Sequence, residues 1–275
     1  MVNLKQILAE RLTTEQIKLL PTSFDIIGDI AIFQDFPPEL RSKEKMIGGA
    51  LMQVHKHVKV VARKIKKFSG KYRLQKIKII AGEKRKETIY KESGALIKLD
   101  VERCYFSPRL GAERLRVARL VRSGEKILVM FSGAAPYPLV IAKNSKAEKI
   151  VGVELNKVAH RYAVENIYLN KLGNINLICG DVNKIVPKLK EKFDRVVMPL
   201  PKRAGDYLEY ALMVTKKRAV VHFYSFGKES EFGVLKEKIK AICKKNKRKI
   251  KILKIVKCGQ YAPEVFRVCV DFRVL

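Results

Sequence analysis

Four short segments of the chain place small or acidic residues at points where an apolar run ends. They are the small-residue turn at 131–136, Glu154, the Gly180-Asp181 pair, and the segment 198–201. In a doubly wound sheet, ligands bind beyond the carboxyl ends of parallel strands. Glu154 follows the turn at about the 20-residue spacing at which an acid binds ribose hydroxyls. The combination predicts a nucleoside-binding site.

Each of these residues also has a simpler structural explanation. Glu154 and Asp181 could cap the turns that follow them, and Gly133 could serve an ordinary tight turn. The turn itself holds one glycine, Gly133, whereas dinucleotide folds use several so that the pyrophosphate can approach the backbone. S-adenosylmethionine carries no phosphate and therefore needs fewer glycines. The pattern favours a methyltransferase-type site over a dinucleotide site.

The elements that position these segments alternate between strands and helices over residues 107–275. Near-continuous apolar strands that alternate with helices indicate a parallel sheet covered on both faces. The last two strands follow each other without a helix, which predicts an antiparallel pair at one edge. The expected strands are 126–131, 149–155, 174–182, 193–201, 218–226, 249–259 and 264–275, and the expected helices are 111–121, 138–144, 157–172, 183–192, 204–217 and 229–246.

The preceding part of the chain has a different rhythm. Residues 1–21 are expected to form an N-terminal helix that Pro21 ends. Residues 22–106 are expected to form a small basic α+β domain that binds RNA. It begins with a strand–turn–strand around Gly28-Asp29, and the later elements are a helix over 39–65 and strands within 72–82 and 86–106.

The strongest compositional signal is the charge. The 275 residues include 58 Lys+Arg and 27 Asp+Glu, which gives a formal net charge of +31. An excess of this size repels itself unless a polyanion is present, and it favours nucleic-acid binding. A lysine-rich genome or a thermophilic surface is the alternative, but that composition normally raises Glu together with Lys.

Other classes of protein fit the sequence poorly. The chain has no apolar run of the roughly 20 residues that span a bilayer, and its first residues lack the apolar region of a signal peptide. We therefore predict a cytoplasmic protein. The five cysteines form no CxxC pair, so buried free thiols are expected rather than a zinc site: Cys104, Cys179, Cys243, Cys258 and Cys269.

Several stretches of the chain carry a family resemblance: SFDIIGDIAI, YFSPRLGAERLRVARLVRSGEKIL, MFSGAAPYPLVIAK, VENIYLNKL, CGDV, DRVVMPLPK, VVHFYSF and YAPEVFRVCVDFRV. Through them, residues 22–275 resemble the archaeal and eukaryotic tRNA (guanine37-N1)-methyltransferases. This resemblance implies an α/β fold, a class I methyltransferase-type doubly wound sheet that is mostly parallel, with an antiparallel edge strand and a small α+β domain before it. It also implies S-adenosyl-L-methionine as cofactor, the tRNA anticodon loop as partner, and a monomer without metal or membrane contact.

The resemblance also implies roles for individual residues. Glu113 resembles the general base that removes the guanine N1 proton, and Arg73 resembles the arginine that holds the guanine and stabilises charge on its O6. Without the resemblance, Glu113 would be interpreted as an ion-pair partner of Arg116 or as a first-turn helix acid. The implied cofactor-binding residues are Arg114, Phe131, Gly133, Glu154, Leu155, Asp181, Val182 and Pro199, and the implied substrate-binding residues are Arg109, Pro201 and Lys202.

The chain departs from the family pattern at three points. Val129 replaces an acid, Ala135 replaces the second glycine of the turn, and Pro199 replaces an Asn before Leu-Pro. An N-terminal domain that grips the tRNA elbow in many members is not seen here. Methylation of guanine N1 at position 37 is the favoured activity. The alternatives are methyl or aminocarboxypropyl transfer to a wyosine-type base at the same position, or an inactive tRNA-binding module.

Overall fold

The computed structural model describes residues 4–275, apart from the side chains of residues 66–69. The chain divides into two units, each described here by itself. The N-terminal unit contains residues 1–91 and 96–108. The sheet unit contains residues 92–95 and 109–275, so the tip of one hairpin belongs to it.

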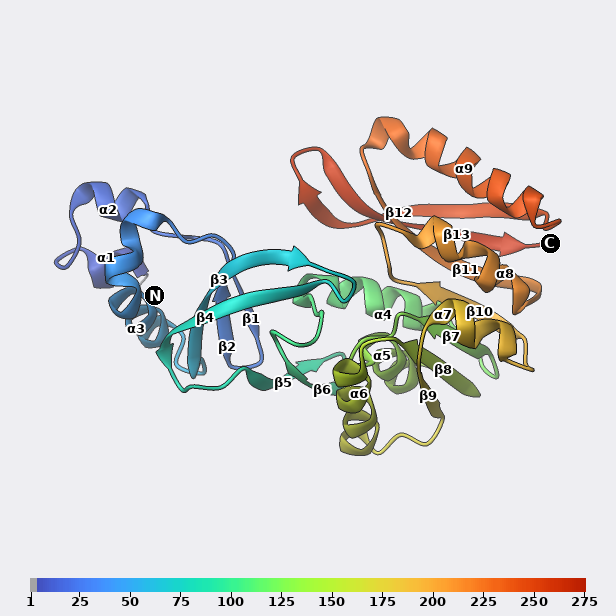
Figure 1. Ribbon diagram of the computed structural model, residues 1–275, viewed down its shortest axis with the longest axis horizontal. Helices are drawn as coiled ribbons and strands as arrows, with labels where there is room; N and C mark the ends of the chain where they lie inside the picture. Colours follow the sequence, from blue (N-terminus) through green and yellow to red (C-terminus); the bar gives the residue numbers. More distant parts are fainter. Residues whose placement is uncertain (1–3) are drawn as a thin grey trace. The chain divides into compact units, whose positions relative to one another are not determined.

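The sheet unit is built on seven strands in the order β12-β13-β11-β10-β7-β8-β9 (Figure 1). The chain runs from β7 outward through β8 to β9 and then crosses to β10 on the other side of β7. The carboxyl ends of β7 and β10 therefore form the topological switch point at which such sheets bind ligands. The strands are β7 Lys126–Met130, β8 Lys149–Glu154, β9 Ile175–Cys179, β10 Phe193–Met198, β11 Thr215–Gly227, β12 Ile250–Ala262 and β13 Val265–Val274.

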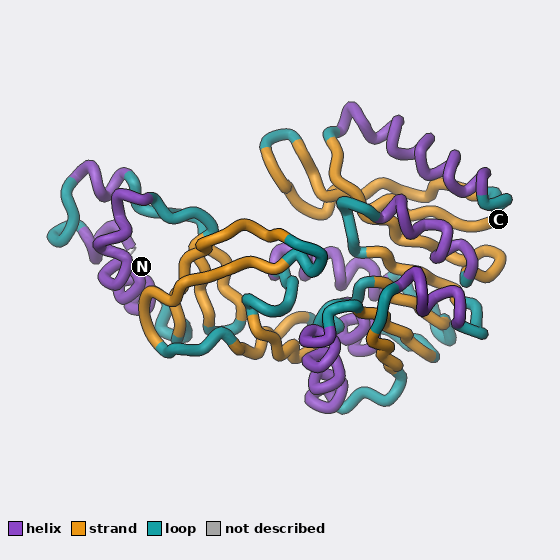
Figure 2. Tube along the Cα trace, in the orientation of Figure 1, coloured by secondary structure: helices purple, strands orange, loops and turns teal. Residues whose placement is uncertain are grey.

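The predicted doubly wound, mostly parallel sheet is confirmed, with one difference in its order. The reversed strand is β13, which pairs antiparallel with both β11 and β12, so it lies one strand in from the edge. Helices cover both faces of this sheet (Figure 2). The core on the face of α8 and α9 is formed by residues such as Met130, Phe193 and Phe272. The helices are α4 Gly111–Arg119, α5 Pro136–Asn144, α6 Lys157–Asn170, α7 Val182–Ile185, α8 Leu208–Met213 and α9 Phe232–Lys245.

The N-terminal unit holds a four-stranded sheet in the order β1-β2-β3-β4 and a two-stranded hairpin, β5-β6. Strands β1 and β2 pair through the predicted two-residue turn at Gly28-Asp29. A Cβ atom on Gly28 would lie 2.1 Å from Thr88 Oγ1, and its φ is +60°, so this turn requires glycine. The elements are α1 Leu4–Leu8, α2 Thr14–Lys18, β1 Phe24–Ile27, β2 Ile30–Phe33, α3 Glu44–Val54, β3 Val60–Ser69, β4 Leu74–Gly82, β5 Glu87–Glu92 and β6 Ala95–Asp100.

Two of the predicted helices in this unit were wrong. The helix expected over 39–65 ends at Val54, and residues from Val60 onward form β3. The described part of residues 1–21 forms two short helices rather than one, because Thr13 caps a new helix with its side chain bonded to the Gln16 amide. Leu8 of α1 lies in the same core as α3, together with Leu12 and Leu20 from the segments on either side of α2, and Ile17 of α2 packs against this core.

The burial of the cysteines agrees only in part with the expectation. All five thiols are free, but Cys179 is exposed and Cys258 is half-buried, so only three are buried. Among the described residues, no helix has the length and apolar character that crossing a membrane requires.

Candidate cofactor and catalytic site

The turn after β7 has an unusual backbone. Phe131, Gly133 and Ala135 all have φ near +60°, so every second residue of the turn is left-handed. Only Gly133 adopts this conformation without a steric penalty, because the Cβ of other residues approaches the following carbonyl. The turn is nevertheless held in place. The Ser132 amide donates to Val153 O at 3.0 Å, and Asn166 of α6, fully buried, donates to Ala134 O at 3.1 Å.

Glu154 joins three of the strand ends that the sequence singled out. Its Oε2 accepts a hydrogen bond of 2.7 Å from the Gly133 amide, and its backbone carbonyl accepts one of 2.8 Å from Gly180. Its Oε1 accepts from the Asn156 amide at 2.7 Å, and Asn156 itself caps α6. Burial raises the pKa of Glu154, while these amide donors oppose the rise. Glu154 is therefore a brace between the turn and β8, and not the cap of the next helix.

The geometry of this site fits S-adenosylmethionine. Each Glu154 oxygen accepts one of these amide bonds and so keeps a second lone pair, which two ribose hydroxyls could use. The Ser132 hydroxyl is buried and has no hydrogen-bond partner among the described residues. Glu154, Gly133 and Ser132 are thus the residues best placed to hold a nucleoside without a phosphate.

The other predicted cofactor residues differ in how accessible their side chains are to a ligand. Leu155, Asp181 and Pro199 are half-buried at the ends of β8, β9 and β10, as expected from their spacing. Asp181 does not cap α7 with its side chain. Val182 is buried in the core of the sheet unit, so only its backbone remains to contact a ligand. Their roles as cofactor ligands remain predictions.

Arg114, one of the predicted cofactor residues, forms a buried ion pair, and its role as a cofactor ligand remains a prediction. Its guanidinium is buried and makes a two-pronged ion pair with Glu92, with Nε and Nη2 at 2.6 and 2.5 Å from the carboxylate oxygens. Gly111 permits this contact, because a Cβ there would lie 2.9 Å from Glu92 Oε2. The bond ties α4 to the tip of the β5–β6 hairpin within the sheet unit.

Glu113, the predicted base, is fixed by three donors. Arg116 donates to both of its carboxylate oxygens at 2.7 and 2.8 Å, and Tyr224 donates to Oε1 at 2.6 Å. Tyr137 in turn donates to the Tyr224 hydroxyl at 2.9 Å. Burial raises the pKa of both tyrosines well above 10, so both hydroxyls keep their protons. The Glu113 carboxylate, 5% exposed, has one defined orientation.

A buried chain of charges continues from this carboxylate. Arg116 also donates to Asp271 at 2.7 Å, and Asp271 Oδ1 lies 2.6 Å from Nδ1 of the fully buried His222. The His222 Nε2 atom lies 2.7 Å from the guanidinium of Arg195, which can only donate. His222 is thus neutral with its proton on Nδ1, and burial lowers its pKa. Cys269 completes a close group of potential metal ligands here, but both ring nitrogens of His222 are already bonded.

The buried His222 in this network predicts that the stability of the protein depends on pH. The unfolded chain takes up a proton on His222 near pH 6.5, whereas the folded chain, with its lowered pKa, does not. The free energy of unfolding should be fully retained above pH 6.5 and fall below it by up to about 1.4 kcal/mol per pH unit. Urea unfolding from pH 8 to 5.5 measures this slope. The variant His222→Gln should have a smaller slope than the parent, and equal slopes would contradict the assignment.

A second prediction concerns the left-handed residue Ala135, which stands where the family has glycine. Because the left-handed region costs a non-glycine residue about 1–2 kcal/mol, partly offset by the freedom glycine gains on unfolding, Ala135→Gly should raise the free energy of unfolding by about 0.5–1 kcal/mol. The neighbouring Ala134→Gly, without a positive φ, is the control and should lower it. Thermal denaturation of both variants measures the difference, and a loss of stability in Ala135→Gly would contradict the strain.

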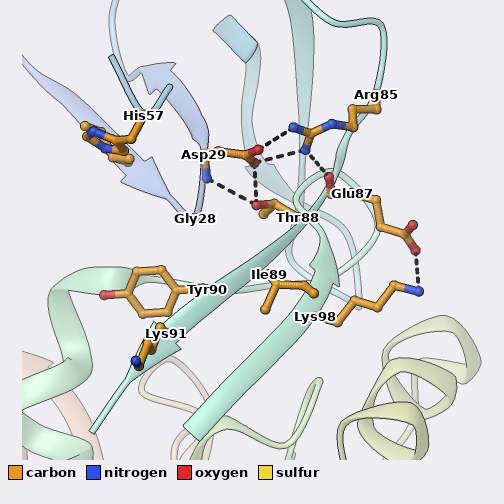
Figure 3. Close-up of a pocket in the computed structure, with 11 residues that line it drawn as sticks. Gly28, Asp29, His57, Arg85, Glu87, Thr88, Ile89, Tyr90, Lys91 and Lys98 are labelled. Atoms are coloured by element: carbon orange, nitrogen blue, oxygen red, sulfur yellow. Dashed lines mark hydrogen bonds and ion pairs between the residues drawn. The ribbon is translucent and has the colours of Figure 1, made fainter. Parts of the chain in front are cut away.

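The N-terminal unit contains Arg73 and, apart from it, a pocket lined by both charged and apolar residues. Arg73 is half-buried, has a φ of 52°, and stacks its guanidinium 4.7 Å from the centre of the Tyr105 ring. In the pocket, of about 760 Å³, Arg85 makes two bonds to Asp29, and Thr88 Oγ1 donates to Asp29 at 2.8 Å (Figure 3). The bonds from Arg85 lower the pKa of Asp29. The charge of Asp29 is thus balanced by Arg85 of the same unit.

The three predicted substrate-binding residues differ in their exposure. Arg109 and Lys202 are exposed, Lys202 with its ammonium 6.0 Å from the Tyr261 ring centre, and Pro201 is buried. Sequence reasoning did not identify Glu92, which pairs with Arg114, or Tyr224, which donates to Glu113. It also missed Tyr137, which donates to Tyr224, and Asp271, which pairs with Arg116. The last three lie within stretches that carry the resemblance, but no role was assigned to them.

Comparison with known proteins places this geometry in a family. Residues 88–253 match the TRM5/TYW2 methyltransferase domain, and residues 4–85 match the TYW2 N-terminal domain. The tRNA (guanine(37)-N(1))-methyltransferase Trm5b of Pyrococcus abyssi is 42% identical over 258 residues, covering 94% of this chain and 76% of that protein.

Two further relatives belong to the other branch of this family. The tRNA(Phe) (4-demethylwyosine(37)-C(7)) aminocarboxypropyltransferase of Pyrococcus horikoshii is 30% identical, covering 98% of this chain and 96% of that protein. The crystal structure of P. horikoshii TYW2 in complex with MeSAdo is similar with a TM-score of 0.83 at 29% identity, covering 99% of this chain and 98% of that one. The switch-point site and these matches together show that the chain belongs to the TRM5/TYW2 methyltransferase family.

Proposed function

We propose that this protein transfers a methyl group from S-adenosylmethionine to N1 of guanine 37 in tRNA. The observation that carries the proposal is the Glu113 carboxylate, held in one orientation by Arg116 and Tyr224. The 42% identity to a protein named for this reaction supports it. The cofactor would be held at the turn after β7, with Glu154 on the ribose hydroxyls.

The residues of this chain have two tasks in the proposed reaction. The chemistry supplied by bound S-adenosylmethionine is an electrophilic methyl group on a sulfonium, so alignment matters more than leaving-group activation. Guanine N1 carries a proton at neutral pH, and Glu113 would accept it as the N1–methyl bond forms. To the extent that the proton leaves N1 ahead of the new bond, negative charge develops on the guanine O6, where the guanidinium of Arg73 would stabilise it until the methyl group is transferred. The N-terminal unit would bind the anticodon-loop RNA.

A second candidate is transfer to a wyosine-type base at the same tRNA position. Three observations favour it. Residues 4–85 match the TYW2 N-terminal domain, and a relative of nearly the same length is an aminocarboxypropyltransferase. Pro199 also removes the side-chain amide that the resemblance expects beside the acceptor base.

One experiment separates the candidates. The protein is incubated with unmodified tRNA, or with tRNA carrying 4-demethylwyosine, and with S-adenosylmethionine labelled either in the methyl group or in the aminocarboxypropyl carbons. The tRNA is then digested to nucleosides. Methyl label in 1-methylguanosine is the expected result. Label only from the aminocarboxypropyl carbons, or methyl label only in the tricyclic base, would select the second candidate. Tight tRNA binding without any label would leave an inactive binding protein.

A further inference from the structure

A basic pocket lies in the sheet unit at the edge opposite the candidate cofactor site. It has a volume of about 870 Å³ and is bounded by the end of α4, the loop 120–125, and the first residues of β10 and β11. Because β7, β10 and β11 run parallel, this is the amino edge of the sheet. None of the described residues that the resemblance assigns to cofactor or substrate lines this pocket.

The lining of this pocket carries more cationic than acidic side chains. Its three acids are all engaged: Glu125 pairs with Arg195, Asp271 with Arg116 and His222, and Asp194 with Lys216. Six further cations of the lining make no ion pair or side-chain hydrogen bond within residues 4–275, leaving aside the side chains of 66–69. They are Arg119, Arg122, Lys217, Arg218, Lys254 and Arg273. Of the paired residues, Arg195, His222 and Asp271 are buried, whereas five of the six unpaired cations are exposed and Arg273 is half-buried.

The backbone presents some of these cations at a strained position. Between Phe193 and Arg195 of β10, the register with β11 advances from Thr215 to Val220, so extra residues of β11 bulge out of the sheet. Within the bulge, Arg218 has a φ of 69°, which a non-glycine side chain rarely adopts. Lys217 and Arg218 are both exposed there. The strain persists at a point where it displays two adjacent cations to the pocket.

We propose that this pocket binds the phosphodiester backbone of the tRNA, at nucleotides other than the one modified. Guanidinium groups match phosphate oxygens in two-pronged geometry, and four of the six unpaired cations are arginines. The pocket is too large for one phosphate group alone, and a run of backbone would engage cations on several of its walls. The net charge of +31 indicates a polyanionic partner. The inference rests on the proposed function for the identity of the RNA.

The test compares two triple variants that lose the same charge. The pocket variant is Arg122→Gln/Lys217→Gln/Arg218→Gln, and the control is Lys238→Gln/Lys244→Gln/Lys245→Gln, on exposed lysines of α9 outside the pocket. Binding of full-length tRNA is measured by filter retention at several salt concentrations. The plot of log affinity against log salt has a negative slope, and the magnitude of this slope should be smaller by about 2 in the pocket variant than in the parent. The affinity of the pocket variant at 0.1 M salt should be at least about tenfold lower. The control should change by less than half as much.

The outcomes are separable from those of the proposed function. Equal losses in the two variants would show a diffuse attraction and overturn the pocket, as would an unchanged pocket variant. A melting temperature within about 2 °C of the parent excludes unfolding as the cause. If the parent methylates guanine 37 and the pocket variant binds normally, only the pocket proposal fails. If the parent methylates no tRNA but binds it in the pocket-dependent manner described, only the proposed function fails.

Discussion

Glu113→Gln is expected to reduce turnover by about 100- to 10,000-fold while leaving the affinity for tRNA nearly unchanged. Glutamine keeps the shape, and its single carbonyl oxygen can still accept from Arg116 Nη2 and Tyr224. Its amide nitrogen loses the bond from Arg116 Nε, and the side chain cannot accept the N1 proton as a carboxylate does. The fold should persist because Arg116 retains Asp271 as an ionic partner. Single-turnover rates with saturating tRNA and S-adenosylmethionine measure the effect.

The control for this prediction is Glu209→Gln, which changes an exposed glutamate of α8 in the same unit. It should leave both rate and affinity at the parental values. A Glu113→Gln protein that loses tRNA affinity in proportion to its rate would show that the carboxylate organises the structure and does not act as a base. A protein with full turnover would remove Glu113 from the reaction altogether.

The fold of the sheet unit could be predicted because its strands are buried on both faces and punctuated by turn residues. The helix predicted over 39–65 was wrong at its end because the sequence there fits both a helical and a strand periodicity. Val54, Val58 and Val61 fit a helical stripe, but the β-branched residues from Val60 onward also fit a strand, and pairing with β2 and β4 decided for the strand. The helix predicted over 183–192 ends as α7 at Ile185, because Pro187 cannot continue it.

The candidate site was predictable where it depends on strand ends and not where it depends on long-range pairing. Gly133, Glu154 and Gly180 are linked by hydrogen bonds because parallel strands bring their carboxyl ends to one edge. The contact between Arg116 and Asp271 joins residues 155 positions apart, and no local pattern encodes it. The left-handed backbone at Phe131 was equally hidden, because its side chain type argues against that conformation.

The second large effect is expected at Arg114, where stability and cofactor binding can be separated. Arg114→Met leaves the buried carboxylate of Glu92 without its ionic partner, so the free energy of unfolding should fall by about 3–5 kcal/mol. Replacing both residues, in Glu92→Met/Arg114→Met, removes the pair without leaving a buried charge. This double variant should recover most of the lost stability, since apolar replacements of buried pairs are often neutral. Urea unfolding measures both changes.

The double variant also decides what Arg114 does beyond this pair. If Arg114 only ties α4 to the β5–β6 hairpin tip, restored stability should bring back the parental affinity for S-adenosylmethionine, measured by calorimetric titration. If Arg114 lines the cofactor pocket as the resemblance implies, the double variant should be stable yet bind the cofactor weakly. A single Arg114→Met variant with parental stability would contradict the ion pair itself. Because two of the five guanidinium N–H donors bond to Glu92 and fix the plane of the group, we expect the first result.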